Sequence, residues 1–144
     1  MQISKFTDLS LRVLMYLTYE EGTTSPKIND IADKFSVPKN HLMKVVAHMN
    51  TLGWIQTIRG RTGGLKLLKH PDNLRLGDVM SSLEHGSLIN CAKTACPIRG
   101  ECNLKSILDI ELSKFYQELN KYRLSDVVDA KTKIAVIRLH RAAA

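Results

Sequence analysis

Residues 28–69 read INDIADKFSVPKNHLMKVVAHMNTLGWIQTIRGRTGGLKLLK, and the spacing of their apolar side chains predicts two consecutive helices. Steps of three and four over residues 28–35 indicate a short helix with one buried face. A second apolar stripe indicates a longer helix over about residues 38–52, which Pro38 can begin because the first turn of a helix needs no N–H from it. With the tight turn Ser36-Val37-Pro38 between them, the two helices form a helix-turn-helix pattern.

Two β-prone segments follow, at about residues 54–58 and 65–69. The sequence between them is Arg59-Gly60-Arg61-Thr62-Gly63-Gly64, and short β segments joined by such a glycine-rich stretch predict a hairpin. A basic hairpin directly after a helix-turn-helix makes the motif winged. We therefore expect a mainly α fold with a small β-hairpin wing.

Further helices are expected on both sides of this motif, at about residues 7–20, 76–84 and 103–122, with a last helical piece from about residue 124. Loops are expected at 22–26 and 70–73. The helix at 103–122 has an apolar stripe at steps of four and three, which fits either packing on its own domain or packing on a second chain. The stripe consists of Leu104, Leu108, Leu112, Phe115, Leu119 and Tyr122.

The charge of the chain favours a polyanionic partner, although a basic surface alone would give the same sum. The 144 residues include 21 Lys and Arg against 14 Asp and Glu, a formal net charge of +7. We see neither a signal peptide nor an apolar run long enough for a membrane helix. We therefore expect a cytoplasmic protein without membrane contact, in which thiols stay reduced.

The polar face of the second helix carries amide, imidazole and ammonium groups, which are suited to the major groove of DNA. The two arginines of the hairpin suit a minor groove or phosphates, and its glycines allow a close approach of the backbone. Each feature alone also describes a solvated surface, but together they predict an interface for double-stranded DNA. The expected DNA-binding residues are Lys39, Asn40, His41, Lys44, Arg59, Gly60, Arg61, Gly63 and Gly64.

Three cysteines with the spacing C-x4-C-x5-C lie in an expected loop at about residues 85–102: Cys91, Cys96 and Cys102. Thiolates on one short loop can converge on one point, they are soft ligands, and iron–sulfur clusters are held mainly by cysteines. The neighbouring cations Lys93, Arg99 and Lys105 favour ionised thiols. We expect an iron–sulfur cluster, whose fourth ligand the loop does not supply as a cysteine.

Other assignments of these cysteines remain open. A zinc site with His85 as fourth ligand is one, and a thiol–disulfide switch using two of the three thiols is another. An electron-transfer iron–sulfur protein would not need a helix-turn-helix. No Ser-His-Asp or Cys-His arrangement is apparent, so we do not expect an enzyme.

With these motifs in place, the chain from residue 1 to about residue 136 resembles the iron–sulfur winged-helix regulators that include NsrR and IscR. The cysteine spacing is most similar to that of NsrR-like members, since IscR-like members carry one more residue in the first gap. Pro38 departs from the pattern, because relatives often have Ser or Thr there. The resemblance rests on Phe6-Thr7-Asp8, Leu11-Arg12, Lys39-Asn40-His41-Leu42, Arg59-Gly60, Gly63-Gly64, Gly77-Asp78-Val79 and Leu88-Ile89-Asn90-Cys91.

The resemblance implies a homodimer joined through the helix at 103–122. It also implies a [2Fe–2S] or [4Fe–4S] cluster held by the three cysteines and by Asp8 of the partner subunit, with Arg12 coupling the cluster to the first helix. From the residues alone, Asp8 is an acid in the first turn of a helix, where the helix dipole stabilises it. Three parts follow: a DNA-binding winged helix-turn-helix domain at 1–84, the cysteine loop at 85–102, and a dimerisation helix with a C-terminal segment at 103–144.

The function implied by the resemblance is a repressor that senses nitric oxide and controls genes of nitrosative stress. Such a dimer binds a two-fold symmetric operator with half-sites about 34 Å apart. The helix at about residues 38–52 would be the recognition helix of each subunit. A change in the cluster that removes the ligand from the partner subunit would move the two recognition helices out of register with the grooves of the DNA. A regulator of the same fold that senses iron–sulfur cluster or iron status, or a thiol-redox switch, is the alternative.

Overall fold

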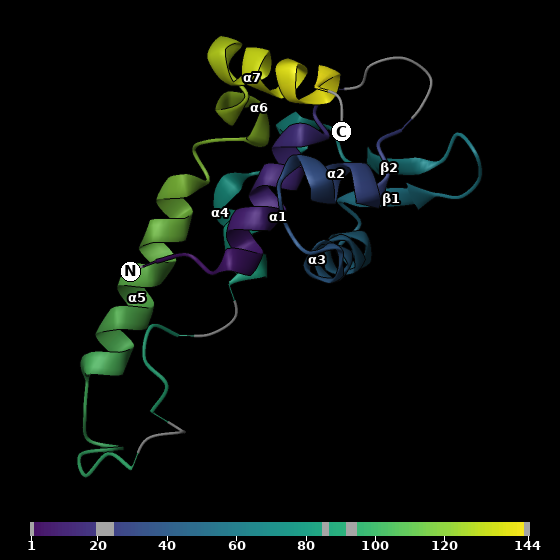
Figure 1. The fold of residues 1–144 in the computed structure, drawn as a ribbon. Helices are drawn as coiled ribbons and strands as arrows, with labels where there is room; N and C mark the ends of the chain where they lie inside the picture. Colours follow the sequence, from purple (N-terminus) through teal and green to yellow (C-terminus); the bar gives the residue numbers. More distant parts are fainter. Residues whose placement is uncertain (1, 20–24, 85–86, 92–94, 143–144) are drawn as a thin grey trace.

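The structure is a computed structural model and describes residues 2–19, 25–84, 87–91 and 95–142 of the chain. It is mainly helical with a single two-stranded antiparallel sheet within these ranges, which confirms the expected fold class (Figure 1). The elements are α1 (Lys5–Tyr16), α2 (Ile28–Lys34), α3 (Lys39–Thr51), β1 (Ile55–Ile58), β2 (Gly64–Leu67), η1 (Pro71–Asn73), α4 (Leu76–Leu83), α5 (Leu104–Leu119), α6 (Leu124–Val127) and α7 (Ala130–Arg141).

The core forms where α1, α2 and α3 meet, because each helix turns an apolar stripe toward the other two. On α3 the stripe consists of Leu42, Val45, Val46 and Met49, all buried as the spacing predicts. Val13 and Leu14 of α1 are fully covered in the same cluster. The helix-turn-helix is therefore held rigidly by α1, and the polar face of α3 is left outside.

The ends of α1 and α3 differ from the expected positions for local reasons. Helix α1 begins at Lys5, two residues early, because Ser4 caps it and its Oγ accepts the backbone N–H of Thr7 at 3.1 Å. The helix stops at Tyr16 rather than near residue 20. At this end, the Oγ1 of Thr18 donates to the carbonyl oxygen of Met15 at 2.7 Å. Pro38 is the capping residue before α3 and not its first helical residue, since its ψ of 130° is not helical.

The hairpin follows α3 directly. Gly53 ends α3 with a φ of +68°, a conformation that glycine adopts easily, and the N–H of Trp54 then donates to the carbonyl oxygen of Met49 at 3.0 Å. In the antiparallel register, Ile55 lies opposite Leu67 and Ile58 lies opposite Gly64. The expected hairpin is confirmed, with its tip at residues 59–63.

Helix α4 is joined closely to α5, which extends away from the rest of the fold (Figure 1). The Oδ1 of Asn120 accepts the backbone N–H of Asp78 at 2.9 Å, and the Nδ2 of Asn120 donates to the Oδ1 of Asp78 at 2.7 Å. A Cβ added to Gly77 would lie 1.9 Å from the carbonyl oxygen of Tyr116, so only glycine permits this approach of the two helices.

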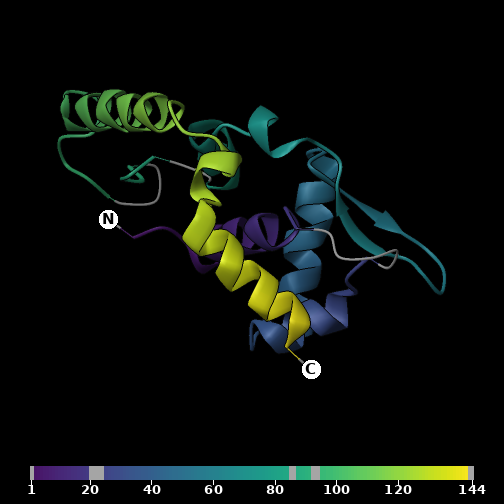
Figure 2. The same ribbon diagram turned by 90° about the horizontal axis from the view of Figure 1, so that it is seen from above.

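The C-terminal segment forms two helices rather than one piece. Helix α6 ends at Val127, and the backbone of Val128 is not helical. Asp129 caps α7, because its carboxylate accepts the backbone N–H of Thr132 at 2.8 Å. This hydrogen bond lowers the pKa of Asp129. Helix α7 returns to the N-terminal helices, as seen from above (Figure 2). There the ring of His140 stacks on Tyr16 with centroids 3.8 Å apart, and its Nε2 donates to the carbonyl oxygen of Tyr16 at 2.9 Å.

Lys34, at the end of α2, binds the C-terminal end of α7. Its Nζ donates to the carbonyl oxygens of Leu139 and His140 at 2.8 Å and to that of Ala142 at 3.1 Å. The last carbonyls of a helix have no partner within the helix, so a cation placed there satisfies them and opposes the helix dipole. Lys34 therefore ties the end of α2 to the C-terminal end of α7.

We expect Lys34→Met to lower the free energy of unfolding by about 2 kcal/mol, because hydrogen bonds from a charged donor are lost while the apolar stem is kept. Urea unfolding followed by circular dichroism measures this change. Lys133→Met, on the exposed part of α7, is the matched control and should stay close to the unchanged chain. Equal stability of the two variants would show that the contact of Lys34 with α7 contributes nothing.

Across the residues that the structure describes, no helix has both the length and the apolar character needed to cross a membrane.

Candidate nucleic-acid interface and cysteine site

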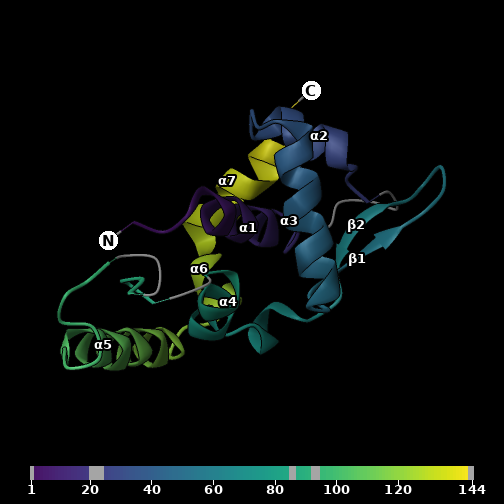
Figure 3. The same cartoon turned by 90° about the horizontal axis from the view of Figure 1, so that it is seen from below.

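Helix α3 presents the polar face that the sequence predicts. Lys39, Asn40, His41 and Lys44 are all exposed, on the side opposite the buried stripe. Figure 3, viewed from below, shows α3 across this side of the fold with the hairpin beside it. The helix and the hairpin can thus face one ligand together, as in winged helix-turn-helix proteins.

The tip of the hairpin is also exposed. Arg59 and Arg61 flank Gly60, whose φ of +109° is in the region that favours glycine. Two guanidinium groups on a projecting turn are suited to phosphates or to a narrow minor groove.

Gly63 and Gly64 have a different environment, because both are buried. A Cβ on Gly63 would lie 2.1 Å from the carbonyl oxygen of Ile58, and one on Gly64 would lie 2.3 Å from that of Ser25. The structure therefore gives this pair a packing role, in which the hairpin closes tightly and lies against the segment before α2. Their contact with DNA stays a prediction.

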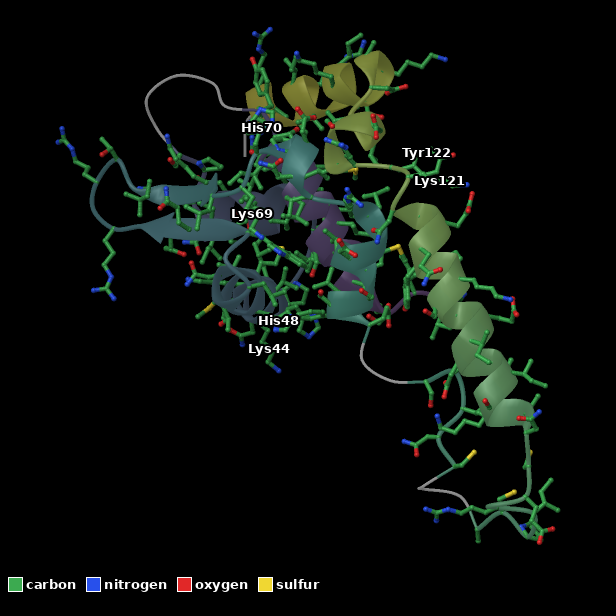
Figure 4. All side chains as sticks on the ribbon, turned by 180° about the vertical axis from the view of Figure 1, so that it is seen from behind. Lys44, His48, Lys69, His70, Lys121 and Tyr122 are labelled. Carbon is green, nitrogen blue, oxygen red and sulfur yellow. The ribbon has the colours of Figure 1, made fainter. Side chains whose placement is uncertain are left out.

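Lys69 is a further exposed cation that the sequence analysis did not single out. The backbone N–H groups of Leu68 and Lys69 both donate to the carbonyl oxygen of Trp54, at 2.8 Å and 3.4 Å, so Lys69 lies at the base of the hairpin close to the end of α3. Figure 4 shows Lys69 from behind together with Lys44 and His48 of α3. The sequence pattern includes Lys69 only as the last residue of the second β-prone segment, which gives no sign that its side chain lies beside α3.

The structure describes residues 87–91 and 95–102 of the cysteine loop, which contain turns and bends and belong to no helix or strand. Cys91 and Cys96 are half-buried, Cys102 is exposed just before α5, and all three are free thiols. Gly100, with a φ of +102°, adopts a conformation that favours glycine and turns the chain at this point of the loop. Among the described residues no three His, Cys, Asp or Glu side chains come together as a metal-binding group, so the structure does not bring the three thiols to one point.

The donor chemistry of the loop nevertheless fits an iron–sulfur cluster, because it consists of three thiols not used in a disulfide and clusters are held mainly by such sulfurs. Lys105, expected to favour thiolates, is paired with Asp109 one turn along α5, while Arg99 is exposed on the loop. His85, the candidate zinc ligand, and Lys93 lie outside the described residues.

Asp8 and Arg12 form a two-point contact on the surface of α1. The Nε of Arg12 donates to one carboxylate oxygen of Asp8 at 3.0 Å, and the Nη2 lies 2.9 Å from the other. Both side chains are about half exposed, so the pair alone contributes little to stability. The geometry leaves the Asp8 carboxylate accessible from outside the chain and holds it in one orientation.

Comparison with known proteins agrees with the winged fold. A family model described as "Rrf2: Iron-dependent Transcriptional regulator" matches residues 3–130. The chain belongs to the Rrf2 family. It is 39% identical over 132 residues to the "HTH-type transcriptional regulator NsrR" of Bacillus licheniformis, which covers 89% of this chain and 92% of that protein. The resemblance to regulators that include NsrR and IscR is thereby confirmed, and the chain is a transcriptional regulator of a DNA-binding family.

Solved structures of Rrf2 regulators share the fold. CymR of B. subtilis, described as its global cysteine regulator, matches with a TM-score of 0.66 and 23% identity, covering 88% of this chain and 95% of CymR. IscR of T. potens matches with a TM-score of 0.70 and 17% identity, covering 100% of this chain and 93% of IscR. At these identities the likeness shows the winged-helix fold alone.

Proposed function

We propose that this Rrf2 regulator is a homodimeric repressor that binds a two-fold symmetric operator and releases it in response to nitric oxide, through an iron–sulfur cluster on the cysteine loop. The observation that carries the proposal is the set of three free thiols spaced C-x4-C-x5-C, on a loop that joins a winged helix-turn-helix to a long exposed helix. The 39% identity to an NsrR supports nitric oxide as the signal. The division into parts at 1–84, 85–102 and 103–144 belongs to this proposal.

In the proposed complex, α3 enters the major groove and the hairpin tip reaches the adjacent minor groove or the backbone. Lys39, Asn40, His41 and Lys44 face the bases and nearby phosphates from α3. Arg59, Gly60 and Arg61 contact DNA from the tip, while Gly63 and Gly64 keep the tip close to the fold. Lys69 adds a phosphate contact at the base of the hairpin.

We expect the double change Arg59→Ala and Arg61→Ala to weaken operator binding and to lower the slope of log affinity against log salt by about 1.8, because each phosphate contact contributes about 0.9. Binding titrations at several salt concentrations give this slope, using the duplex that the unchanged protein enriches from a random-sequence library. Lys133→Ala on α7 serves as the charge control. An unchanged slope would remove the hairpin tip from the proposed interface.

The proposed dimer rests on α5, in which not one residue is buried within a single chain. Ile107 and Ile110 are 50% and 52% exposed, and Leu104, Phe115 and Tyr122 are also exposed. Covering such a face with a second copy removes apolar surface from water at about 25 cal/mol per Å². The exposed apolar face extends beyond the predicted stripe because it includes Ile107 and Ile110. Within the stripe, Leu108, Leu112 and Leu119 are half-buried.

The proposed ligands are Cys91, Cys96 and Cys102 of one chain and Asp8 of the partner subunit. The exposure of the Asp8 side chain supports the last assignment. Bound there, a cluster supplies iron that reacts with nitric oxide. Arg12 orients the Asp8 carboxylate and couples this ligand to α1, which packs directly on the recognition helix.

The experiment that tests the proposal is an iron and acid-labile sulfide assay on anaerobically purified protein. The visible spectrum and operator binding are then followed during addition of nitric oxide. Iron with sulfide, a spectrum bleached by nitric oxide and loss of operator binding support the proposal. Zinc without sulfide, or protein free of metal under strict anaerobiosis, contradicts the sensor and leaves the DNA-binding part in place.

Two other signals fit the same fold. The family description "iron-dependent" favours a regulator that senses iron or cluster supply, and three free thiols favour a redox switch. Iron with sulfide but no response to nitric oxide would indicate the first. A metal-free protein whose DNA binding changes reversibly with a dithiol reductant would indicate the second.

A further inference from the structure

Glu84 lies where three parts of the chain meet. It follows the last residue of α4, and its Oε1 accepts the backbone N–H of Ser4 at 2.5 Å across 80 residues of sequence. Burial of the Tyr116 ring and, second to it, the negative charge of Glu84 raise the pKa of Tyr116 on α5. Glu84 is thus close to the start of α1 and to α5, at the point where the chain enters the cysteine loop.

The partner of Glu84 is the residue that fixes the first turn of α1. The Oγ of Ser4 accepts the N–H of Thr7 at 3.1 Å, and its carbonyl oxygen accepts the N–H of Asp8 at 2.9 Å. Through these two bonds Ser4 holds the backbone of both Thr7 and Asp8, so the position of this turn is coupled to that of Ser4. A displacement of Ser4 therefore displaces the whole turn.

The same turn contacts the recognition helix. Phe6 meets the ring of His48 of α3 edge-on, with centroids 5.6 Å apart and an interplanar angle of 68°. Because α1 packs along α3, the orientation of α3 depends on where the first turn of α1 lies. Contacts therefore run without a gap from Glu84 through Ser4 and Phe6 to His48.

We infer that Glu84 is a positioning residue that links the entry of the cysteine loop to the recognition helix within one chain. The inference rests on the proposed function in one respect, that the cysteine loop is the sensor. It adds a route that needs no ligand from the partner subunit. When the loop changes its path after residue 84, the carboxylate moves with it, the bond to Ser4 is lost, and α1 no longer holds α3 in its binding orientation.

The test compares Glu84→Ala, which removes the acceptor, with Glu84→Gln, whose amide oxygen can still accept the N–H of Ser4. Lys133→Ala, at an exposed position of α7, is the control. For the full-length protein we expect the alanine variant to exchange the amide hydrogens of residues 8–11 about tenfold faster and to bind the library-selected duplex about tenfold more weakly. The glutamine and control variants should stay within about twofold of the unchanged protein.

Unchanged exchange and affinity in Glu84→Ala would overturn the inference. A glutamine variant as impaired as the alanine variant would also overturn it, since charge rather than the bond to Ser4 would then be responsible. Amide exchange of residues 8–11 does not require iron, and the duplex affinities are compared between preparations of equal iron content. A protein without cluster or nitric oxide response would therefore disprove the proposed function, while the comparison of alanine with glutamine still decides the role of Glu84.

Discussion

Replacing Cys96 by alanine is expected to leave a folded protein that no longer retains iron and sulfide and no longer responds to nitric oxide. Changes in residues that only support a metal ligand already weaken metal binding by about 10- to 100-fold, so loss of a proposed direct ligand should exceed that range. Cys96 lies in a loop of turns and belongs to no helix or strand, and therefore the winged helix-turn-helix should remain intact.

The measurement is the ratio of iron and sulfide to protein after anaerobic purification, with circular dichroism to confirm folding. Ser106→Ala, an exposed change on α5, controls for handling losses. Cys102→Ala should reproduce the loss. A Cys96→Ala protein with full cluster content, operator affinity and nitric oxide response would disprove the assignment of the loop.

The second large effect is expected for Gly77→Ala. On an exposed helix this change would stabilise by about 1 kcal/mol, since alanine is the better helix former. Here the added Cβ would lie 1.9 Å from the carbonyl oxygen of Tyr116 and 2.6 Å from the Oδ1 of Asn120, so α4 and α5 must separate. We expect a loss of about 3 kcal/mol from overpacking and from the broken bonds between Asp78 and Asn120.

Urea unfolding measures the loss for Gly77→Ala, and sedimentation velocity shows whether displacement of α5 also disrupts the proposed dimer. Ser81→Ala, at an exposed position of the same helix, is the control. Should Gly77→Ala prove as stable as this control, the contact of α4 with α5 would be looser than the structure describes.

The parts of the fold that depend on local spacing were predictable from the sequence. Helices α2, α3 and α4 and the hairpin lie within about two residues of their expected positions, because a repeat of apolar residues specifies both an element and its buried face. Helix α5 begins one residue after its expected start and ends three residues before its expected end. The polar face of α3 follows from the same pattern. Its exposed residues are therefore those that the sequence marked as candidates for DNA.

Contacts between distant segments were not predictable in this way. Asn120 bonds to Asp78 across 42 residues, and Glu84 bonds to Ser4 across 80, but neither pair has a pattern that points to its partner. Such pairs depend on where whole elements meet, which a single sequence does not encode locally. The same holds for the buried packing of Gly64, whose neighbour Ser25 precedes α2.

The return of α7 to α1 and α2 has a consequence for how the protein is made. Tyr16 is bonded to His140 across 124 residues, and Lys34 is bonded to Leu139 across 105. A ribosome must therefore synthesise the chain past residue 140 before these bonds can form, and contacts of such long range slow folding. Chains that end before α7 lack these bonds, so α1, α2 and α3 are less stably held in them. Cellular proteases should therefore remove these shorter chains in preference to chains that contain α7.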